Sequence, residues 1–403
     1  MELLSPAGNM QKLKTAFLYG ADAVYLAGKT FGMRAAADNF SLAEIEEACG
    51  FARSSGKKVY LTVNVFAKEF EIAGLNEYLR EIRALGALPD ALICSDLGVV
   101  MLAREILPDV KIHISTQANT QNHLTCKAWE KLGASRIILA RELSIKTIKE
   151  IRENISPALE LEAFVHGAMC VAYSGRCLLS NYLTGRDANS GNCTQPCRWE
   201  YHVTENKHQN SPISVEEDER GTTLFSSRDL CMIDNICDLA GSGLNSLKIE
   251  GRMKPAFYVA AVTNAYRLAL DAYFADPAGY VPDASLRTEV ESVSHREYDT
   301  GYFFAPPSEK ANICENPGYI KGKTYFGICV DYEENSGFSV FEQKNKIVKN
   351  TVVEILSPGK VSEAFTADIL LDSNNEPIEA APHPAMLFKV KCRAKPGDML
   401  RSA

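Results

Sequence analysis

The chain has 403 residues, of which 46% are hydrophobic and 23% are charged, and its net charge is −8. This length predicts two or three domains, and the composition excludes a largely disordered chain. The negative charge excludes a general attraction to nucleic acid, so any RNA site is expected to be a local basic patch.

The twelve cysteines could indicate a secreted protein crosslinked by disulfides. The first residues, MELLSPAG, contain neither the basic stretch nor the apolar stretch of a secretory signal, and no apolar run is long enough to cross a membrane. We therefore expect a cytoplasmic protein without membrane contact, whose thiols stay reduced and are partly bound to metal.

Residues 1–275 repeat one unit, a short apolar strand followed by an amphipathic helix. Most of the expected helices end at a glycine, and Ser41 with Glu44 forms a capping-box pattern. Near-continuous apolar strands are typical of a parallel sheet covered on both faces. The expected strands cover residues 2–4, 23–27, 58–64, 91–95, 111–115, 136–140, 161–165 and 246–250.

Eight strand–helix units in about 275 residues match the size of a closed (β/α)8 barrel, a TIM-like fold of the α/β class. An open doubly wound sheet is the alternative, but no G-x-G-x-x-G motif follows the first strand. We expect the barrel to end near residue 275 and a connector with one helix and a Pro-rich stretch to cover residues 276–318.

From residue 319 the apolar pattern changes from helical to alternating. Five or six short strands separated by turn residues predict a small antiparallel β-barrel domain over residues 319–403. Its lysines at positions 344, 346 and 349 are a candidate RNA contact, although such a cluster is usually a solvated face. The polar segment at residues 202–221 is expected to be a solvated insertion without function.

In a (β/α)8 barrel, catalytic groups lie where the strands end. Nearly every expected strand delivers a polar or charged residue there, which predicts a polar pocket, although such residues also cap helices or pair with one another. Arginine suits the binding of carboxylate or phosphate, so an anionic ligand is expected. The candidate catalytic residues are His166, Glu142 and Glu250, and the candidate substrate-binding residues are Arg141, Arg176, Arg198, Arg252, Asn64 and Gln117.

The loop at residues 166–201, after the expected seventh strand, carries four cysteines in the pattern C-x6-C-x15-C-x3-C. Thiolates gathered on a loop are typical of an iron–sulfur cluster or a zinc site. Zinc usually needs a C-x2-4-C pair, so iron–sulfur is the preferred interpretation, and scattered buried thiols are the alternative. The candidate ligands are Cys170, Cys177, Cys193 and Cys197.

Cys231 is a rival to Cys197 as the fourth ligand. Cys231 and Cys237 are expected on a helix that begins near Arg228. At six residues apart on such a helix, they are otherwise expected to pack in the core.

Several stretches resemble the collagenase-like peptidases, peptidase unassigned family 32. They are ELLSPAGN, GADAVYLAG, the block from FVHGAMC to CRWEY, and SLKIEGRMK. Within that family the chain is most similar to the branch that synthesises 5-hydroxyuridine in tRNA. The resemblance implies a [4Fe-4S] cluster held by the four cysteines of the loop, and prephenate as the source of the hydroxyl oxygen. In some relatives a cysteine near position 231 takes the fourth place.

The resemblance therefore implies an enzyme for oxygen-independent 5-hydroxylation of the wobble uridine of tRNA. Its partners would be tRNA, a small dicarboxylate such as prephenate, and either a second copy of the chain or a paralogous subunit. One alternative is a collagenase-like peptidase, for which no H-E-x-x-H or G-x-S-x-G motif is present. The other is a non-catalytic iron–sulfur subunit that serves a paralogue.

Overall fold

The computed structural model describes residues 1–33, 38–199, 217–218, 221–222, 226–307, 309, 312–314, 318–360 and 364–403. The chain forms two compact units, and neither is continuous in sequence. One comprises Met1–Met10, Asp22–Met253 and Arg296–Tyr319, and the other Gln11–Ala21, Lys254–His295 and Ile320–Ala403. The insertion expected at residues 202–221 lies outside the described residues, apart from the short pair β8 (Glu217–Asp218) and β9 (Gly221–Thr222).

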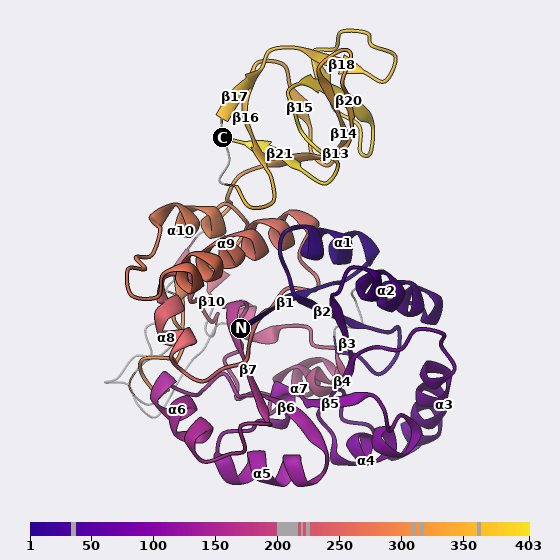
Figure 1. Cartoon of the computed structure of the whole chain (residues 1–403), viewed down its shortest axis with the longest axis vertical. Coiled ribbons are helices and arrows are strands. Elements are labelled where there is room, and N and C mark those ends of the chain that lie inside the picture. The colour runs from indigo at the N-terminus through magenta and orange to yellow at the C-terminus, as the bar shows by residue number, and fades with distance from the viewer. Residues whose placement is uncertain are drawn as a thin grey trace. The chain divides into compact units, whose positions relative to one another are not determined.

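Eight parallel strands of the first unit form a closed barrel (Figure 1). Neighbours pair in sequence order from the first strand to the seventh, and β11 pairs with both β7 and β1, which closes the ring. The predicted (β/α)8 barrel is therefore confirmed, and the open sheet is excluded. The strands are β1 (Glu2–Pro6), β2 (Ala23–Ala27), β3 (Lys58–Val63), β4 (Ala91–Cys94), β5 (Lys111–Ile114), β6 (Ala134–Ile138), β7 (Glu160–Gly167) and β11 (Ser246–Ile249).

Helices of the first unit surround this ring, and most of them bury an apolar stripe. In α6, for example, Ile145, Ile148 and Ile151 are buried, and the Ser144 hydroxyl accepts a hydrogen bond from Thr147 N. The capping box predicted at the start of α2 is confirmed. These helices are α2 (Leu42–Ser54), α3 (Ile72–Arg83), α4 (Leu97–Ile106), α5 (His123–Lys131), α6 (Ile145–Glu153) and α8 (Ile236–Ala240).

The helix expected to begin near Arg228 begins later in the chain: its last part is helix α8, but its predicted start is not helical. The chain there forms strand β10 (Asp229–Cys231), which runs antiparallel to the end of β7 and also pairs with β12 (Tyr298–Asp299). The buried Asp229 carboxylate accepts hydrogen bonds from the Arg296 guanidinium at 2.7 and 2.9 Å. These long-range partners outweigh the local helical pattern.

The second unit contains α1 (Met10–Leu18), α9 (Ala256–Ala275), α10 (Ala284–Glu291) and the C-terminal sheet. Among the described helices of the whole chain, none combines the length and the apolar character that a membrane span requires.

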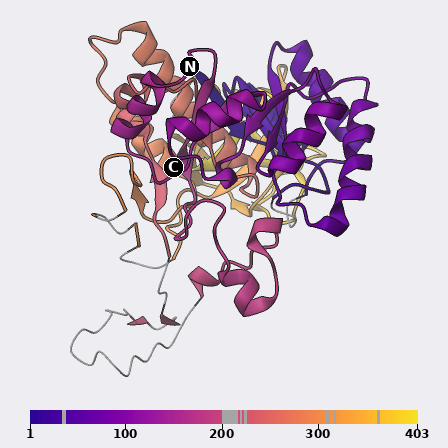
Figure 2. The same ribbon diagram turned by 90° about the horizontal axis from the view of Figure 1, so that it is seen from below.

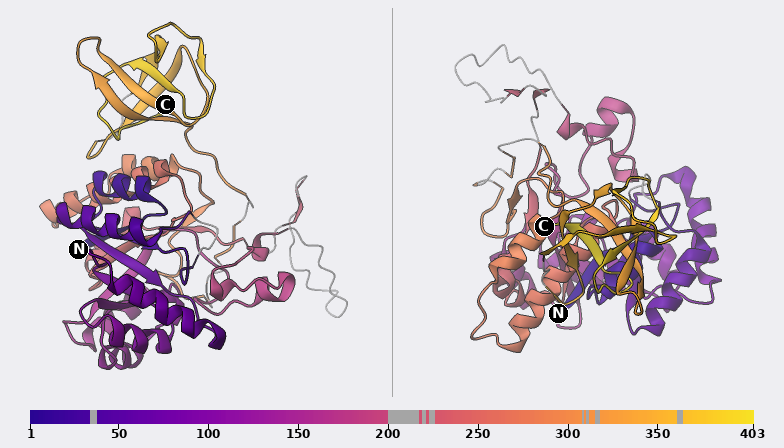
Figure 3. Two further views of the ribbon diagram at one scale, coloured as in Figure 1. Left: turned by 90° about the vertical axis from the view of Figure 1, so that its right-hand side faces the viewer. Right: turned by 90° about the horizontal axis from the view of Figure 1, so that it is seen from above.

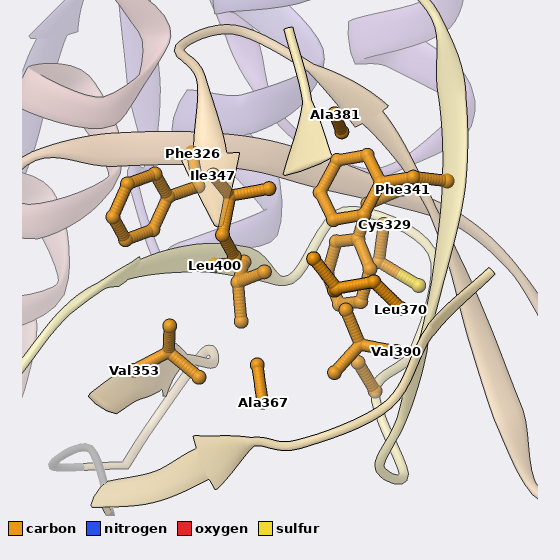
Figure 4. Packing of buried hydrophobic residues seen from close by; sticks show 12 residues of the cluster. Phe326, Cys329, Phe341, Ile347, Val353, Ala367, Leu370, Ala381, Val390 and Leu400 are labelled. Carbon is orange, nitrogen blue, oxygen red and sulfur yellow. The ribbon is translucent and has the colours of Figure 1, made fainter. Parts of the chain in front are cut away.

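The C-terminal sheet has seven antiparallel strands and curls into a half-barrel (Figure 3). In spatial order they are β17 (Ala364–Ala367), β16 (Thr351–Leu356), β21 (Met399–Ser402), β13 (Tyr325–Glu333), β14 (Phe338–Gln343), β20 (Leu387–Lys391) and β18 (Leu370–Asp372). The two edge strands, β17 and β18, are joined by only residues 368 and 369, so the curled sheet brings its own edges together. Phe341, Val390 and Leu400 pack inside it with a short pair, β15 (Ile347–Val348) and β19 (Ala380–Ala381) (Figure 4).

Candidate functional site

A pocket of about 500 Å³ opens where the barrel strands end, and we call it the mouth pocket. It is lined by five residues that the sequence singled out, Asn64, Gln117, Arg141, Glu250 and Arg252. The polar rim predicted at the strand ends is thus assembled into one cavity.

Residues 168–199, which follow β7 and carry the four candidate ligands, are called the cysteine-bearing segment below. A second pocket, of about 840 Å³, lies under this segment, and we call it the cysteine pocket. All four predicted metal ligands line it, together with Glu142. The two pockets share Met33, Thr116, Gln117 and Arg141, so they are adjacent.

Arg141 lies at the border between the two pockets. Its Nη1 donates a hydrogen bond to Ala168 O at 3.0 Å, and its guanidinium lies 4.1 Å from the centre of the Phe164 ring. Its Nη2 is 3.8 Å from the Glu250 carboxylate. Within the described part of the chain, the buried Nε has no hydrogen-bond partner. Because a buried donor without a partner is costly, Arg141 is suited to bind an anionic ligand at this border.

Arg252 and Asn64 hold the loop after β2 over the mouth pocket. The buried Arg252 donates to Asn39 Oδ1 at 3.1 Å and to Met33 O. Asn64 Oδ1 accepts a hydrogen bond from Met33 N at 3.2 Å, and Asn64 Nδ2 donates to Ser115 Oγ at 3.4 Å. Both side chains line the pocket, and both position its wall.

The cysteine-bearing segment is fastened to the barrel at two neighbouring points. The Glu142 carboxylate accepts a hydrogen bond from Ser174 N at 3.0 Å. At Gly175, where φ is +71°, a Cβ would lie 2.1 Å from Gln117 O, so this close approach requires glycine. The segment therefore rests directly on the loop after β5.

The other three cysteines of this segment act electrostatically on Cys197. Burial raises the pKa of the Cys197 thiol, and Cys170, Cys193 and Cys177 raise it further, whereas Arg198 lowers it. Four thiols around one pocket form a soft donor set of the kind that iron–sulfur clusters use. Among the described residues, no three histidine, cysteine, aspartate or glutamate side chains stand in an arrangement that would already hold a metal ion.

Cys231 does not share this pocket. It is buried on β10, opposite His166 of β7. Of the two candidates for the fourth ligand, only Cys197 lines a cavity with the other three.

Three other predicted site residues lie outside both pockets. His166 is buried, with Nε2 3.2 Å from Tyr298 Oη. Arg176 is exposed, and Arg198 Nη1 donates to Gln195 Oε1 at 2.6 Å. A catalytic role for His166 stays a prediction, and neither arginine lines a pocket.

Lys248 of β11 is a pocket residue that the sequence reasoning missed. It is buried, its Nζ lies 3.1 Å from Glu162 Oε1, and it is 4.3 Å from the centre of the Tyr25 ring. Burial lowers the pKa of Lys248, and Glu162 opposes that effect. The available signal was the alternation of the strand, because Lys248 lies two residues before Glu250 and therefore on the same face.

Beneath Lys248, the barrel interior is charged rather than aliphatic. Glu162 also accepts a hydrogen bond from Arg136 Nη1 at 2.9 Å, and the same nitrogen lies 2.6 Å from Glu2 Oε1. This network ties the floor of the mouth pocket to the opposite end of the barrel.

The chain matches the models of a known protein family over most of its length. The model of peptidase family U32 matches residues 8–313, and that of the family's C-terminal domain matches residues 321–401. The chain is 37% identical to tRNA hydroxylation protein P1 of Bacillus subtilis, over 99% of this chain and 94% of that protein.

Two further relatives carry other names. An uncharacterised protease of Methanocaldococcus jannaschii is 45% identical over 75% of this chain and 73% of its own length. The 23S rRNA 5-hydroxycytidine C2501 synthase of Escherichia coli is 36% identical over 77% of this chain and 43% of its own length. With the barrel, the cysteine segment and the C-terminal domain all matched, this chain belongs to peptidase family U32.

Proposed function

We propose that this chain is a tRNA-modifying enzyme that hydroxylates the wobble uridine at C5, with an iron–sulfur cluster and with prephenate as the oxygen donor. The observation that carries the proposal is the junction of two pockets at Arg141, one lined by four cysteines and the other by charged groups at the barrel mouth. The names of the Bacillus subtilis and Escherichia coli relatives, which concern hydroxylation of tRNA and of an rRNA pyrimidine, support the reaction class.

The two pockets suit two small reactants. Arg141, with its unpartnered Nε, would bind a carboxylate of the dicarboxylate. Glu250, which accepts a hydrogen bond from Tyr25 Oη at 3.3 Å, is the candidate to receive the proton that uridine C5 loses. Lys248 would stabilise negative charge at the pocket floor.

Cys170, Cys177, Cys193 and Cys197 would hold the cluster. When bound, an iron–sulfur cluster supplies one-electron redox or Lewis-acid chemistry that amino acid side chains lack. Hydroxylation of a pyrimidine carbon needs such a group, so the position of the cysteines beside the mouth pocket supports the proposal.

The peptidase function that the family name suggests has less support. A serine or cysteine peptidase needs a nucleophile activated by a base, usually histidine. No histidine lines either pocket in the part of the chain that the structure describes.

The test is mass spectrometry of tRNA nucleosides from a strain that lacks this gene and its paralogues. We expect 5-oxyuridine derivatives to disappear and to return when the gene is restored. Unchanged levels in the deletion strain would refute the function. Restoration by the Arg141→Met variant at the wild-type level would instead indicate a non-catalytic subunit.

A further inference from the structure

The cysteine-bearing segment has an outer face as well as the inner face that lines the cysteine pocket. Figure 2 shows this segment, with helix α7 (Leu179–Thr184), extending away from the barrel strands. On it, Tyr182 is 85% exposed, Tyr173 is 52% exposed and Trp199 is 41% exposed. Because three exposed aromatic side chains gather on this one short segment, we treat it as a candidate interaction surface.

The same segment is basic, although the chain as a whole carries a net charge of −8. Residues 168–199 contain three arginines, at positions 176, 186 and 198, and only one acidic residue, Asp187. Asp187 is already paired, at 3.5 Å from Lys68 Nζ. Arg176 and Arg186 are exposed, and within the described residues neither forms an ion pair. Their charges are therefore available to an anionic partner.

The basic cluster expected in the C-terminal domain differs from this segment because most of its charges already have acidic partners. Lys344 is paired with Glu342, and Lys349 lies 3.4 Å from Glu379. Two of those three lysines are thus neutralised by neighbours. The cysteine-bearing segment is therefore more complementary to the negative charge of RNA than the lysine cluster of the C-terminal domain.

The position of the cysteine pocket gives a second argument. A folded RNA cannot enter a pocket beneath this segment, so most of the RNA must be held outside it. Enzymes that modify a base take it out of its stack, and exposed aromatic side chains commonly stack on the neighbouring unpaired bases. Tyr173 lines the cysteine pocket and is also exposed, so it connects the cavity with the outer face.

We propose that Tyr173, Arg176, Tyr182, Arg186, Arg198 and Trp199 form the surface on which a single-stranded loop of the RNA substrate docks. The arginines would contact phosphates, and the aromatic rings would stack on bases beside the nucleotide that reaches the two adjoining pockets. This inference rests on the proposed function and deepens it by naming the binding surface. It also explains how an acidic protein holds an anionic substrate, since the contact is local.

Binding of unmodified tRNA to the full-length protein, followed by fluorescence anisotropy at several salt concentrations, tests the surface. We expect Tyr182→Ala to weaken binding between about fivefold and about 150-fold, the range for loss of one base–aromatic stack. The double variant Arg176→Gln/Arg186→Gln should weaken binding and lower the slope of log K against log salt by about 1.4, for two lost contacts to a single strand.

The matched control for the arginines is Arg80→Gln/Arg104→Gln, since both residues are exposed on α3 and α4 of the same unit. The control for the tyrosine is Phe274→Ala, an aromatic residue that is half exposed on α9. Both controls should bind tRNA as the wild type does, and thermal melting should show all variants to be folded.

The outcomes separate this inference from the function on which it rests. If wild-type protein restores 5-oxyuridine in cells and the Tyr182 and arginine variants bind tRNA as tightly as their controls, the docking surface is refuted and the function stands. If the variants bind tRNA normally but lose a paralogous subunit, the face serves a protein partner and the inference is also refuted. If a strain lacking the gene and its paralogues keeps its 5-oxyuridine, the function itself fails.

Discussion

The Lys248 ammonium lies 3.1 Å from the Glu162 carboxylate inside the barrel, directly below the mouth pocket. Both side chains are buried, so Lys248 depends on Glu162 for compensation of its charge, whereas Glu162 is also paired with Arg136. The pair thus joins the floor of the proposed active site to the structural core of the barrel.

Replacement of Lys248 by methionine should lower the free energy of unfolding by about 3 kcal/mol, because removal of one partner leaves a buried charge less compensated. Arg136 retains its contact with Glu162, which limits the loss. Urea denaturation measures the effect. The control is Lys58→Met, which removes a mostly exposed lysine 3.5 Å from Glu2 and should cost less than about 1 kcal/mol. Equal losses in the two variants would contradict a compensated buried pair.

Gly175 should be required for the placement of the cysteine-bearing segment. Alanine there would put a Cβ 2.1 Å from Gln117 O, so Gly175→Ala should shift the segment and abolish tRNA hydroxylation. Gly185→Ala is a matched control, because φ is +69° but nothing lies within 4 Å of the added Cβ. It should cost only about 1–2 kcal/mol in backbone strain and keep the activity. Loss of activity in both variants would show that strain alone is responsible.

The iron content of the protein should depend on the four cysteines that line the cysteine pocket and not on Cys231. We expect Cys170→Ser, Cys177→Ser, Cys193→Ser and Cys197→Ser each to lose iron and sulfide in protein purified without air, since each removes one soft ligand. Cys231→Ser should retain both, because Cys231 is buried on β10 and lines neither pocket. Iron loss in Cys231→Ser combined with iron retention in Cys197→Ser would reverse this assignment.

Arg141 should be needed for its planar fork as well as for its charge. Arg141→Lys keeps the charge but cannot bind a carboxylate through two parallel hydrogen bonds. We expect it to lower hydroxylation between about tenfold and about 150-fold, the equivalent of one hydrogen bond to a charged group. The exposed Arg53→Lys is the control. Full activity of Arg141→Lys in nucleoside mass spectrometry would exclude a bidentate role.

His113 should make the stability of the protein depend on pH. Burial lowers the pKa of His113 well below its ordinary value, and Arg136 and Lys248 add to that effect. The folded state therefore keeps the imidazole neutral, while the unfolded chain takes up a proton below about pH 6.5. The free energy of unfolding should fall by about 1.4 kcal/mol per pH unit below that value.

The His113→Gln variant should lose this slope between pH 6 and about pH 5, a window set by the ordinary pKa of histidine. The exposed His383→Gln variant should keep it. Urea titrations at each pH give the comparison, and a slope that persists in His113→Gln would assign the effect to another group.

The barrel and its cysteine loop were accessible from the sequence because both depend on local signals. Short apolar strands alternating with glycine-terminated helices specify the (β/α)8 unit, and the cysteines follow the seventh strand directly. The residues at strand ends share one rim in any such barrel, so Asn64, Arg141 and Glu250 could be placed at the mouth before the structure was known.

Other features were decided by contacts between residues that are distant in the sequence. Strand β10 replaces the expected start of a helix because Asp229 accepts a hydrogen bond from Arg296, which lies 67 residues away in the sequence. Strands β17 and β18 follow each other in the sequence but lie at opposite edges of the C-terminal sheet, and β21, from the end of the chain, lies between β16 and β13.

The roles of the charged residues were likewise set by the tertiary structure. Arg252 is occupied by the loop after β2, Arg176 faces outward, and Lys248 lines the pocket floor. A sequence shows that a side chain is cationic, but its neighbours decide whether that charge is already paired. Local backbone preferences therefore determined the fold and the position of the site along the chain, and only long-range packing decided which of its charges are free to act.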